Sequence, residues 1–216
     1  MTVGSLDRIG LRRKPKQERS IQRLDMILSA AAQLIAEKGV GAMRMTELAA
    51  AAKVPIGSVY QYFPEKAAVV KALFDRHSIA IRARVADAFA SVQSAAQVVD
   101  VLEATVDWYY EDYRSNAARL GIWLGTETDQ DLAQLNIEHN TRIAAIFRDT
   151  VRRIAPDLDA VDMEARTYLF SQLIGSSVRL AVTSEPCLAA RVLEEWKSVI
   201  RTSFFAPAPA LDRLPA

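Results

Sequence analysis

The segment from Thr46 to Lys66 constrains the fold of this chain most, because it predicts two short helices joined by a tight turn. It reads TELAAAAKVPIGSVYQYFPEK. Thr46 can cap the first helix by accepting a hydrogen bond from a free backbone N–H group of the first turn. Pro55 ends that helix, because proline lacks the N–H donor and pushes the preceding residue out of the helical region. Gly57 and Ser58 then begin the second helix.

The second of these helices has the character of a DNA-reading helix. At about 100° per residue, Val59 and Phe63 fall on one face, which can anchor the helix. Ser58, Gln61 and Tyr62 then lie largely on the other face. A helix pair of this kind lays its second helix in the major groove, where an amide side chain can pair with adenine. Tyrosine and threonine hydroxyls suit phosphate oxygens, which fix the register of a protein on the duplex.

The residue types in this segment follow the pattern T-x-L-A-x-x-A-x-V-x-x-G-S-V-Y-x-Y-F-x-x-K. Over about Ser20 to Leu73, the chain resembles the helix-turn-helix of the tetracycline-repressor (TetR) family of bacterial regulators. Lys53 departs from the glycine that is usual in the turn, and Pro64 replaces a helix-capping polar residue of many members. The resemblance implies that six matching residues lie at the DNA: Thr46, Gly57, Ser58, Tyr60, Tyr62 and Lys66. With neighbouring residues of suitable position or chemistry, the predicted DNA-binding set also includes Arg44, Pro55, Ile56 and Gln61.

Charge is distributed unevenly along the 216-residue chain, although the formal net charge is only +1. Residues 1–66 hold eleven Lys and Arg against six Asp and Glu, whereas the remaining residues hold sixteen against twenty. This asymmetry is typical of a nucleic-acid-binding module joined to a part that need not touch nucleic acid. The single cysteine, Cys187, and the lack of a long apolar run predict a cytoplasmic protein without a membrane partner.

Apolar residues recur at helical spacing over most of the chain, which predicts an all-α fold. The first helix is expected from Glu18 to Lys38, with Gly39 as a left-handed cap. Later helices are expected at 65–92, 95–114, 116–124, 129–154, 160–183 and 186–205. The predicted parts are a basic flexible arm (1–17), a three-helix helix-turn-helix DNA-binding domain (18–66), a helical ligand-binding and dimerisation domain (67–206) and a flexible tail (207–216). The basic arm has two open interpretations, a DNA contact or a solvated tail.

Aromatic residues gather in the middle of the predicted second domain. Trp and Tyr supply both apolar surface and the polar groups that orient a ligand. By resemblance to the family, these helices would enclose a small-molecule inducer, largely apolar or aromatic. Ordinary core packing is the alternative for each residue. The predicted ligand-binding set is Trp108, Tyr109, Tyr113, Trp123, His139, Phe147 and Tyr168.

The last two predicted helices carry an apolar arc that is wider than the roughly 100° of a core-facing stripe. Ser171 and Gly175, one turn apart, form a smooth patch where another backbone can come close. A second copy of the chain would cover the surplus in a twofold four-helix interface. Such a homodimer would present recognition helices about 34 Å apart to a palindromic site. The predicted dimer set is Phe170, Ser171, Ile174, Gly175, Val178, Leu193, Trp196 and Ile200.

The residue spacings of enzymes and metal sites are missing from this sequence. His77 and His139 lie far apart, without an H-x-x-x-H or C-x-x-C spacing. We therefore expect no catalytic residue, metal or cofactor, and a transcriptional regulator, most simply a repressor released from double-stranded DNA by its ligand. One alternative is an all-α small-molecule-binding protein or enzyme whose first helices serve protein interaction. Another is an architectural DNA-binding protein that senses no ligand.

Overall fold

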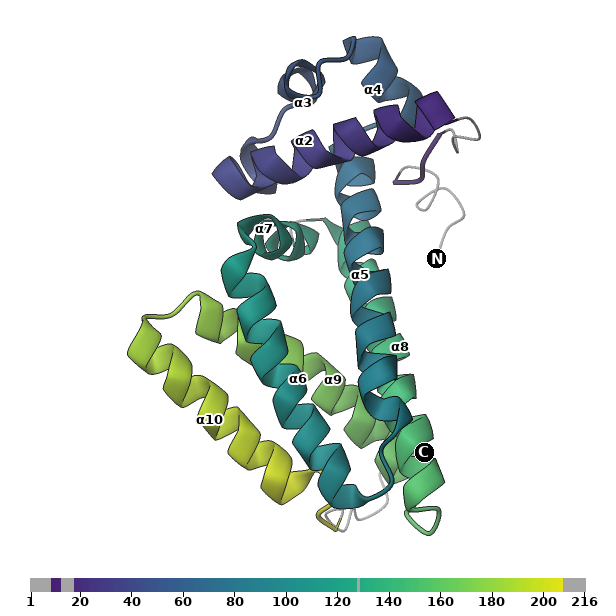
Figure 1. Ribbon diagram of the computed structural model, residues 1–216, viewed down its shortest axis with the longest axis vertical. Helices are drawn as coiled ribbons and strands as arrows, with labels where there is room; N and C mark the ends of the chain where they lie inside the picture. Colours follow the sequence, from purple (N-terminus) through teal and green to yellow (C-terminus); the bar gives the residue numbers. More distant parts are fainter. Residues whose placement is uncertain (1–8, 13–17, 128, 208–216) are drawn as a thin grey trace, which may run out of the picture. The chain divides into compact units, whose positions relative to one another are not determined.

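The computed structural model describes residues 9–12, 18–127 and 129–207, and these residues form an all-helical protein (Figure 1). The all-α prediction is confirmed. The predicted flexible arm lies mostly outside the described residues, and the predicted tail lies outside them from residue 208 onward. Within the described ranges no helix is long and apolar enough to cross a membrane. The helices are α2 (Glu18–Ala42), α3 (Met45–Ala51), α4 (Ile56–Tyr62), α5 (Lys66–Ala90), α6 (Ala95–Ser115), α7 (Ala117–Thr126), α8 (Gln130–Ile154), α9 (Ala160–Val182) and α10 (Pro186–Ser203).

The described residues pack into two compact units. The first, which we call the head unit, contains the chain up to Ala83 together with Asp112–His139. The second, the body unit, contains Arg84–Glu111 and the chain from Asn140 onward. This division cuts α5, α6 and α8 and places α7 with the helices of the predicted DNA-binding domain. It therefore differs from the domain boundary after residue 66 that the sequence motif predicts.

The core of the head unit is built from one face of each of its first helices. Leu28 of α2, Leu48 of α3, Val59 of α4 and Val69 of α5 are all buried in it. Ile9 joins the same core and is only 1% exposed. The prediction of a flexible arm is therefore wrong for residues 9–12, because an apolar side chain in that segment is buried against the helices.

The predicted stop at Gly39 falls on a break inside α2 rather than on its end. Gly39 has a φ of 76° and a ψ of 167°, and one further turn continues to Ala42. Positive φ is open to glycine because it has no Cβ. The sequence correctly marks the break. It does not reveal that the helix resumes after it.

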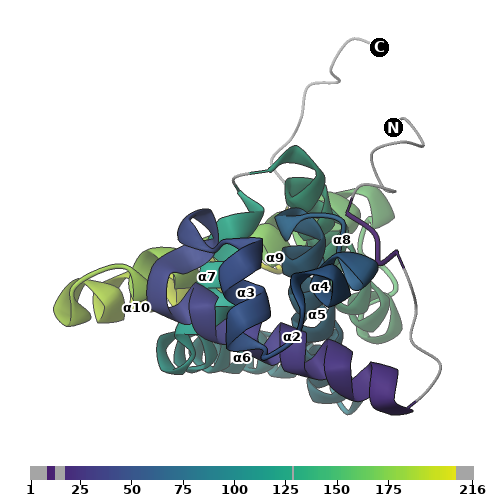
Figure 2. The same cartoon turned by 90° about the horizontal axis from the view of Figure 1, so that it is seen from above.

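α7 crosses α2 at very close range, and both views show the two helices side by side (Figure 1, Figure 2). A Cβ atom built on Gly121 would lie 2.7 Å from Cγ2 of Ile35, and one built on Gly125 would lie even closer to Cγ2 of Val40. The two glycines are one helical turn apart, so they form a single smooth face. A larger residue at either position would push the helices apart.

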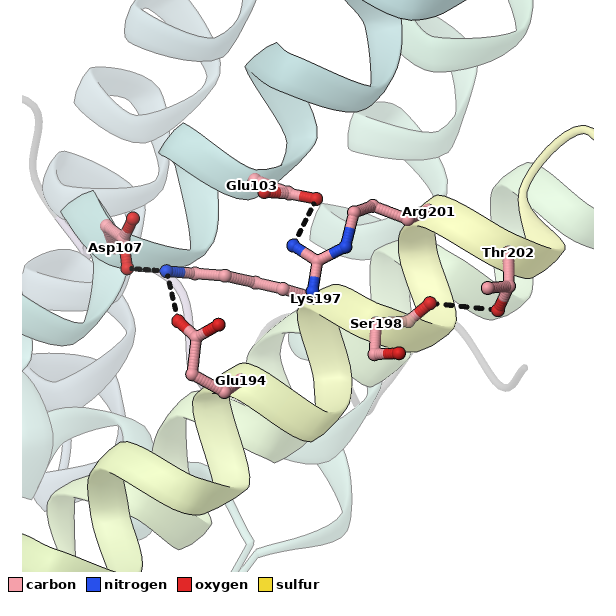
Figure 3. Close-up of polar contacts among 7 residues, drawn as sticks. All are labelled: Glu103, Asp107, Glu194, Lys197, Ser198, Arg201 and Thr202. Atoms are coloured by element: carbon pink, nitrogen blue, oxygen red, sulfur yellow. Dashed lines mark hydrogen bonds and ion pairs between the residues drawn. The ribbon is translucent and has the colours of Figure 1, made fainter.

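In the body unit, α10 is held by an aromatic contact on one side and by ion pairs on another. The rings of Phe170 in α9 and Trp196 in α10 lie 5.3 Å apart. Nζ of Lys197 lies 2.6 Å from Oδ1 of Asp107 in α6, and Arg201 makes a similar pair with α6 (Figure 3). Because these contacts come from two directions, they fix the rotation of α10 about its own axis.

Candidate nucleic-acid interface

α3 begins one residue before the predicted cap. Its N-cap is Arg44, whose backbone N–H donates to Oε2 of Glu47 at 3.1 Å. Lys38 also donates to this carboxylate at 2.6 Å, and that hydrogen bond lowers the pKa of Glu47. The prediction that Thr46 caps the helix is wrong, because the glutamate carboxylate takes the capping role. Thr46 instead lies exposed in the first turn of α3.

The turn between α3 and α4 passes through Lys53, whose φ is 55°. The left-handed region costs a non-glycine residue about 1–2 kcal/mol. Backbone bonds hold the turn in place: Lys53 donates to the carbonyl of Ala50, and Val54 to that of Ala49, each at 3.0 Å. Lys53 therefore stands where the family usually has glycine, in a backbone conformation that favours glycine.

α4 is anchored on one face and exposed on the other, and Figure 2 looks onto α3 and α4. Val59 and Phe63 are completely buried, as the helical spacing predicts. Ile56 and Tyr60 are large side chains on the exposed face, and Tyr60 is 42% exposed. Apart from its chain neighbours and the nearby backbone of α4, no described atom lies within 4 Å of a Cβ built on Gly57. The packing of the chain itself therefore does not require glycine at this position.

Tyr62 does not share the exposed face of α4. Its side chain is 4% exposed, and its hydroxyl donates to the backbone carbonyl of Ser20 at 3.4 Å. The prediction that it faces outward beside Gln61 is wrong, because Tyr62 follows Val59 by three residues and so shares its buried face. Gln61 itself is exposed. The phenol of Tyr62 thus joins α4 to the start of α2.

Two basic residues flank the motif. Nζ of Lys66, the first residue of α5, donates to the backbone carbonyl of Gly41 at 2.9 Å. Gly41 lies in the last turn of α2, three residues before the exposed Arg44. At the entry to α4, the exposed Pro55 accepts from the N–H of Ser58 at 2.8 Å. Polar and basic groups therefore flank the exposed face of α4.

Three of the predicted ligand-binding residues lie in the head unit. Tyr113 and Trp123 pack with ring centroids 4.8 Å apart, and the hydroxyl of Tyr113 lies 3.2 Å from Nε2 of His77. His139 is buried and packs edge-on against Phe74 at 5.9 Å. His77 is not among the residues that the sequence predicts for this set. The sequence signal that could have identified His77 is its position as a polar residue among the apolar positions of a long helix.

The surroundings of His77 disfavour its protonated form. Burial, followed by the charge of Arg119, lowers its pKa to about 4. Arg119 also forms an ion pair with Asp112, whose other carboxylate oxygen has no hydrogen-bond partner among the described residues. A cluster of aromatic and polar side chains therefore lies inside the head unit.

The other predicted ligand-binding residues lie in the body unit. Trp108 packs against Tyr109 at 4.9 Å, and burial raises the pKa of Tyr109. Arg84 lies over the ring of Trp108, and both residues line a small pocket of about 130 Å³. Phe147 is buried, whereas Tyr168 is exposed. The predicted set is thus divided between the two units.

The predicted dimer residues are mostly buried within the chain itself. All of them except Gly175 are buried: Phe170, Ser171, Ile174, Val178, Leu193, Trp196 and Ile200. The prediction that these side chains face a partner is therefore wrong, because they pack between α9, α10 and their neighbours. A different set of apolar residues is exposed on the same helices. We call it the outer face, and it comprises Leu169, Leu173 and Leu180 of α9 with Leu188 and Val199 of α10.

The described residues contain no group of three or more His, Cys, Asp or Glu side chains that could hold a metal ion. The free cysteine, Cys187, is exposed at the start of α10. Neither observation assigns a chemical role to Cys187 or to the His, Asp and Glu side chains of the described residues.

Comparison with known proteins places both parts of the chain in one group. Residues 27–73 match the family described as "Bacterial regulatory proteins, tetR family", and residues 96–208 match "Tetracyclin repressor-like, C-terminal domain". An uncharacterised HTH-type transcriptional regulator from the lacX 3' region of Lactococcus lactis subsp. lactis is 24% identical over 187 residues, or 83% of this chain and 92% of that protein.

Solved structures of similar fold cover most of the chain. A TetR-family transcriptional regulator from Streptomyces coelicolor has 24% identity and a TM-score of 0.64, with 85% of this chain and 95% of that chain covered. A complex of SmeT with triclosan has 18% identity and a TM-score of 0.63, with 90% of this chain and 100% of that chain covered.

Proposed function

Because this chain belongs to the tetracycline-repressor family and is a DNA-binding transcriptional regulator, we propose that it is a repressor that binds a palindromic operator as a homodimer. A small molecule releases it from the operator. The observation that carries this proposal is the geometry of α4, which exposes one face at a helix-turn-helix while its other face is fixed in the core.

We assign the exposed face of α4 to the major groove. Gln61 pairs with an adenine, and Ile56 meets a thymine methyl group. Tyr60 and Thr46 bind phosphate oxygens, which position the protein without reading sequence. Gly57 leaves room for the sugar-phosphate backbone, and the open space around it supports this role. The flanking Arg44, Ser58 and Lys66 complete the phosphate contacts. Pro55 caps the start of α4 beside them, whereas the buried Tyr62 holds α4 in place.

The outer face on α9 and α10 is the proposed dimer interface. Leu169 and Leu180 are 52% and 55% exposed, and Leu188 is 56% exposed. Exposed apolar surface of this kind marks an interaction site. The ion pairs of Lys197 and Arg201 with α6 turn the opposite side of α10 outward. A second copy covers this side most simply in a twofold four-helix arrangement.

The inducer is proposed to be a largely apolar or aromatic small molecule. The aromatic residues of both units support this proposal, as does the existence of a structural neighbour in complex with triclosan. Binding favours a dimer whose recognition helices no longer match the spacing of the half-sites. A coupling of about 1–3 kcal/mol between ligand and DNA would lower operator affinity about 5- to 150-fold.

The decisive experiment is selection of DNA from the source genome. Sheared fragments are incubated with the purified protein at a salt concentration of about 150 mM, near physiological ionic strength, and the retained fragments are sequenced. We expect enrichment of one or a few palindromes. Compounds related to the products of the adjacent genes are then added to the complex. Uniform retention of fragments would contradict a sequence-specific regulator, and ligand binding without loss of operator affinity would contradict the switch.

A further inference from the structure

The segment Ile9–Arg12 is built into the head unit, although it precedes the first helix of the motif. Ile9 lies in the same hydrophobic core as Val59 and Phe63, the anchoring residues of α4. Leu11, two residues later, is 36% exposed. The family match to the DNA-binding domain begins only at residue 27. This segment therefore supports the motif from outside the residues that match the family.

The backbone of this segment ends at the recognition helix. The N–H of Arg12 donates to the carbonyl of Tyr62 at 3.0 Å. Tyr62 is the last residue of α4, and the last carbonyls of a helix have no partner within the helix. Because α4 has only seven residues, a bond at its end fixes a large part of it. The hydroxyl of the same tyrosine is held by Ser20, so two contacts set the direction of α4.

The side chain of Arg12 is exposed at this end of α4. A cation is favoured near the C-terminus of a helix, where the backbone carbonyls carry partial negative charge. A guanidinium group also binds phosphate oxygens in a bidentate manner, and phosphate contacts supply much of the affinity of a protein for DNA. Arg12 thus brings a phosphate-binding group to the end of the helix that reads the bases.

We propose that Ile9–Arg12 is a positioning element of the DNA-reading head. Ile9 anchors the segment in the core, the backbone N–H of Arg12 caps the recognition helix, and the guanidinium of Arg12 binds an operator phosphate. This inference rests on the proposed function, since it requires an operator. It adds a DNA contact and a support for α4 that the helix-turn-helix pattern does not contain.

The test uses five variants of the full-length protein: Ile9→Ala, Ile9→Val, Leu11→Ala, Arg12→Ala and Arg12→Pro. Affinity for the selected operator and for a scrambled duplex is measured by fluorescence anisotropy over a range of salt concentrations. Arg12→Ala removes the charge but keeps the N–H, whereas Arg12→Pro removes both. Leu11→Ala is the control for truncating an apolar side chain in the same segment.

We expect Arg12→Ala to weaken binding to both duplexes and to reduce the slope of log affinity against log salt by about 0.9 for each phosphate that the variant no longer binds. Arg12→Pro should weaken operator binding further. Ile9→Ala should weaken operator binding about tenfold, because a misplaced α4 loses base contacts to a degree comparable with one mismatched base pair. Its effect on the scrambled duplex should be smaller. Ile9→Val should retain most of the affinity, and Leu11→Ala should behave as the wild type.

A second measurement separates positioning from stability. Hydrogen exchange of residues 56–63 is followed in the DNA-free protein at a temperature well below each unfolding midpoint. Arg12→Pro and Ile9→Ala should accelerate this exchange, and Arg12→Ala should not. An unchanged salt slope for Arg12→Ala overturns the phosphate contact. Normal operator affinity and normal exchange for a folded Ile9→Ala protein overturn the positioning role. Failure of the wild type to select any DNA would instead contradict the proposed function.

Discussion

Gly125→Ala tests the close crossing of α7 over α2, and the structure allows its effect to be worked out. The new Cβ atom would collide with Cγ2 of Val40 and lie only 3.0 Å from its Cβ. Rotation of the valine side chain cannot move its own Cβ, so the two helices must separate. Overpacking of this kind costs about 1–3 kcal/mol. In an unobstructed helix interior, replacing Gly by Ala would instead stabilise the protein by about 1 kcal/mol.

We therefore expect a net loss of up to about 2 kcal/mol in the free energy of unfolding of Gly125→Ala, or a midpoint lowered by a few degrees. The measurement is chemical denaturation followed by circular dichroism, with a thermal scan beside it. Val40→Ala in the same chain removes both Cγ atoms but keeps Cβ, so the double variant should recover part of the loss, with a coupling of about 0.5–3 kcal/mol. A Gly125→Ala protein that is more stable than the wild type, by the roughly 1 kcal/mol expected at an unobstructed helix position, would refute the close approach of the two helices.

Four further predictions concern the reading head, the outer face and the buried histidine. Gly57→Ala should unfold at the wild-type temperature or slightly above it, because alanine favours the helix, yet bind operator at least about tenfold more weakly, since the added methyl group meets only the DNA. Lys53→Gly should raise the free energy of unfolding by about 1 kcal/mol, because it relieves a positive φ in the turn. Leu180→Glu should yield monomers by analytical ultracentrifugation, whereas Leu158→Glu in the loop before α9 should not. Burial lowers the pKa of His77 from 6.5 to about 4, so on acidification the unfolded protein binds a proton at this residue before the folded protein does. The stability of the protein therefore falls as the pH drops between these values. The unfolding midpoint of His77→Gln should depend less on pH in this range.

Much of the fold follows from local sequence signals. Apolar residues at helical spacing and the prolines between them predict the helices, and a motif confined to about twenty residues predicts the reading head. Thr46 does not cap α3 because the side chain of Glu47 competes for the same helix end. The face of Tyr62 is hard to predict because a seven-residue helix has few positions from which to define a buried face. Both errors are shifts of one residue or one face within a correctly predicted element.

The remaining errors depend on contacts between distant parts of the chain. The apolar arc of α10 includes both Trp196 and Leu188, and periodicity alone does not tell which of them faces outward. That choice follows from ion pairs with α6, whose residues are about ninety positions away in the sequence. Ile9 lies in a short, basic segment whose few apolar residues do not extend into a helical stripe, so the sequence gives no sign that it is buried. Neither its burial nor its support of α4 can be predicted without the tertiary structure.

The glycine face of α7 limits how this regulator can be recombined with others. A chimaera that exchanges residues 18–66 alone would transplant Ile35 and Val40 onto a foreign α7, and any side chain in place of Gly121 or Gly125 would then obstruct the join. The natural unit of exchange is the discontinuous one, in which the segment from Asp112 to His139 travels with the first 83 residues. The DNA specificity of this protein can therefore be moved to a foreign scaffold only if two separate stretches of sequence are transferred together.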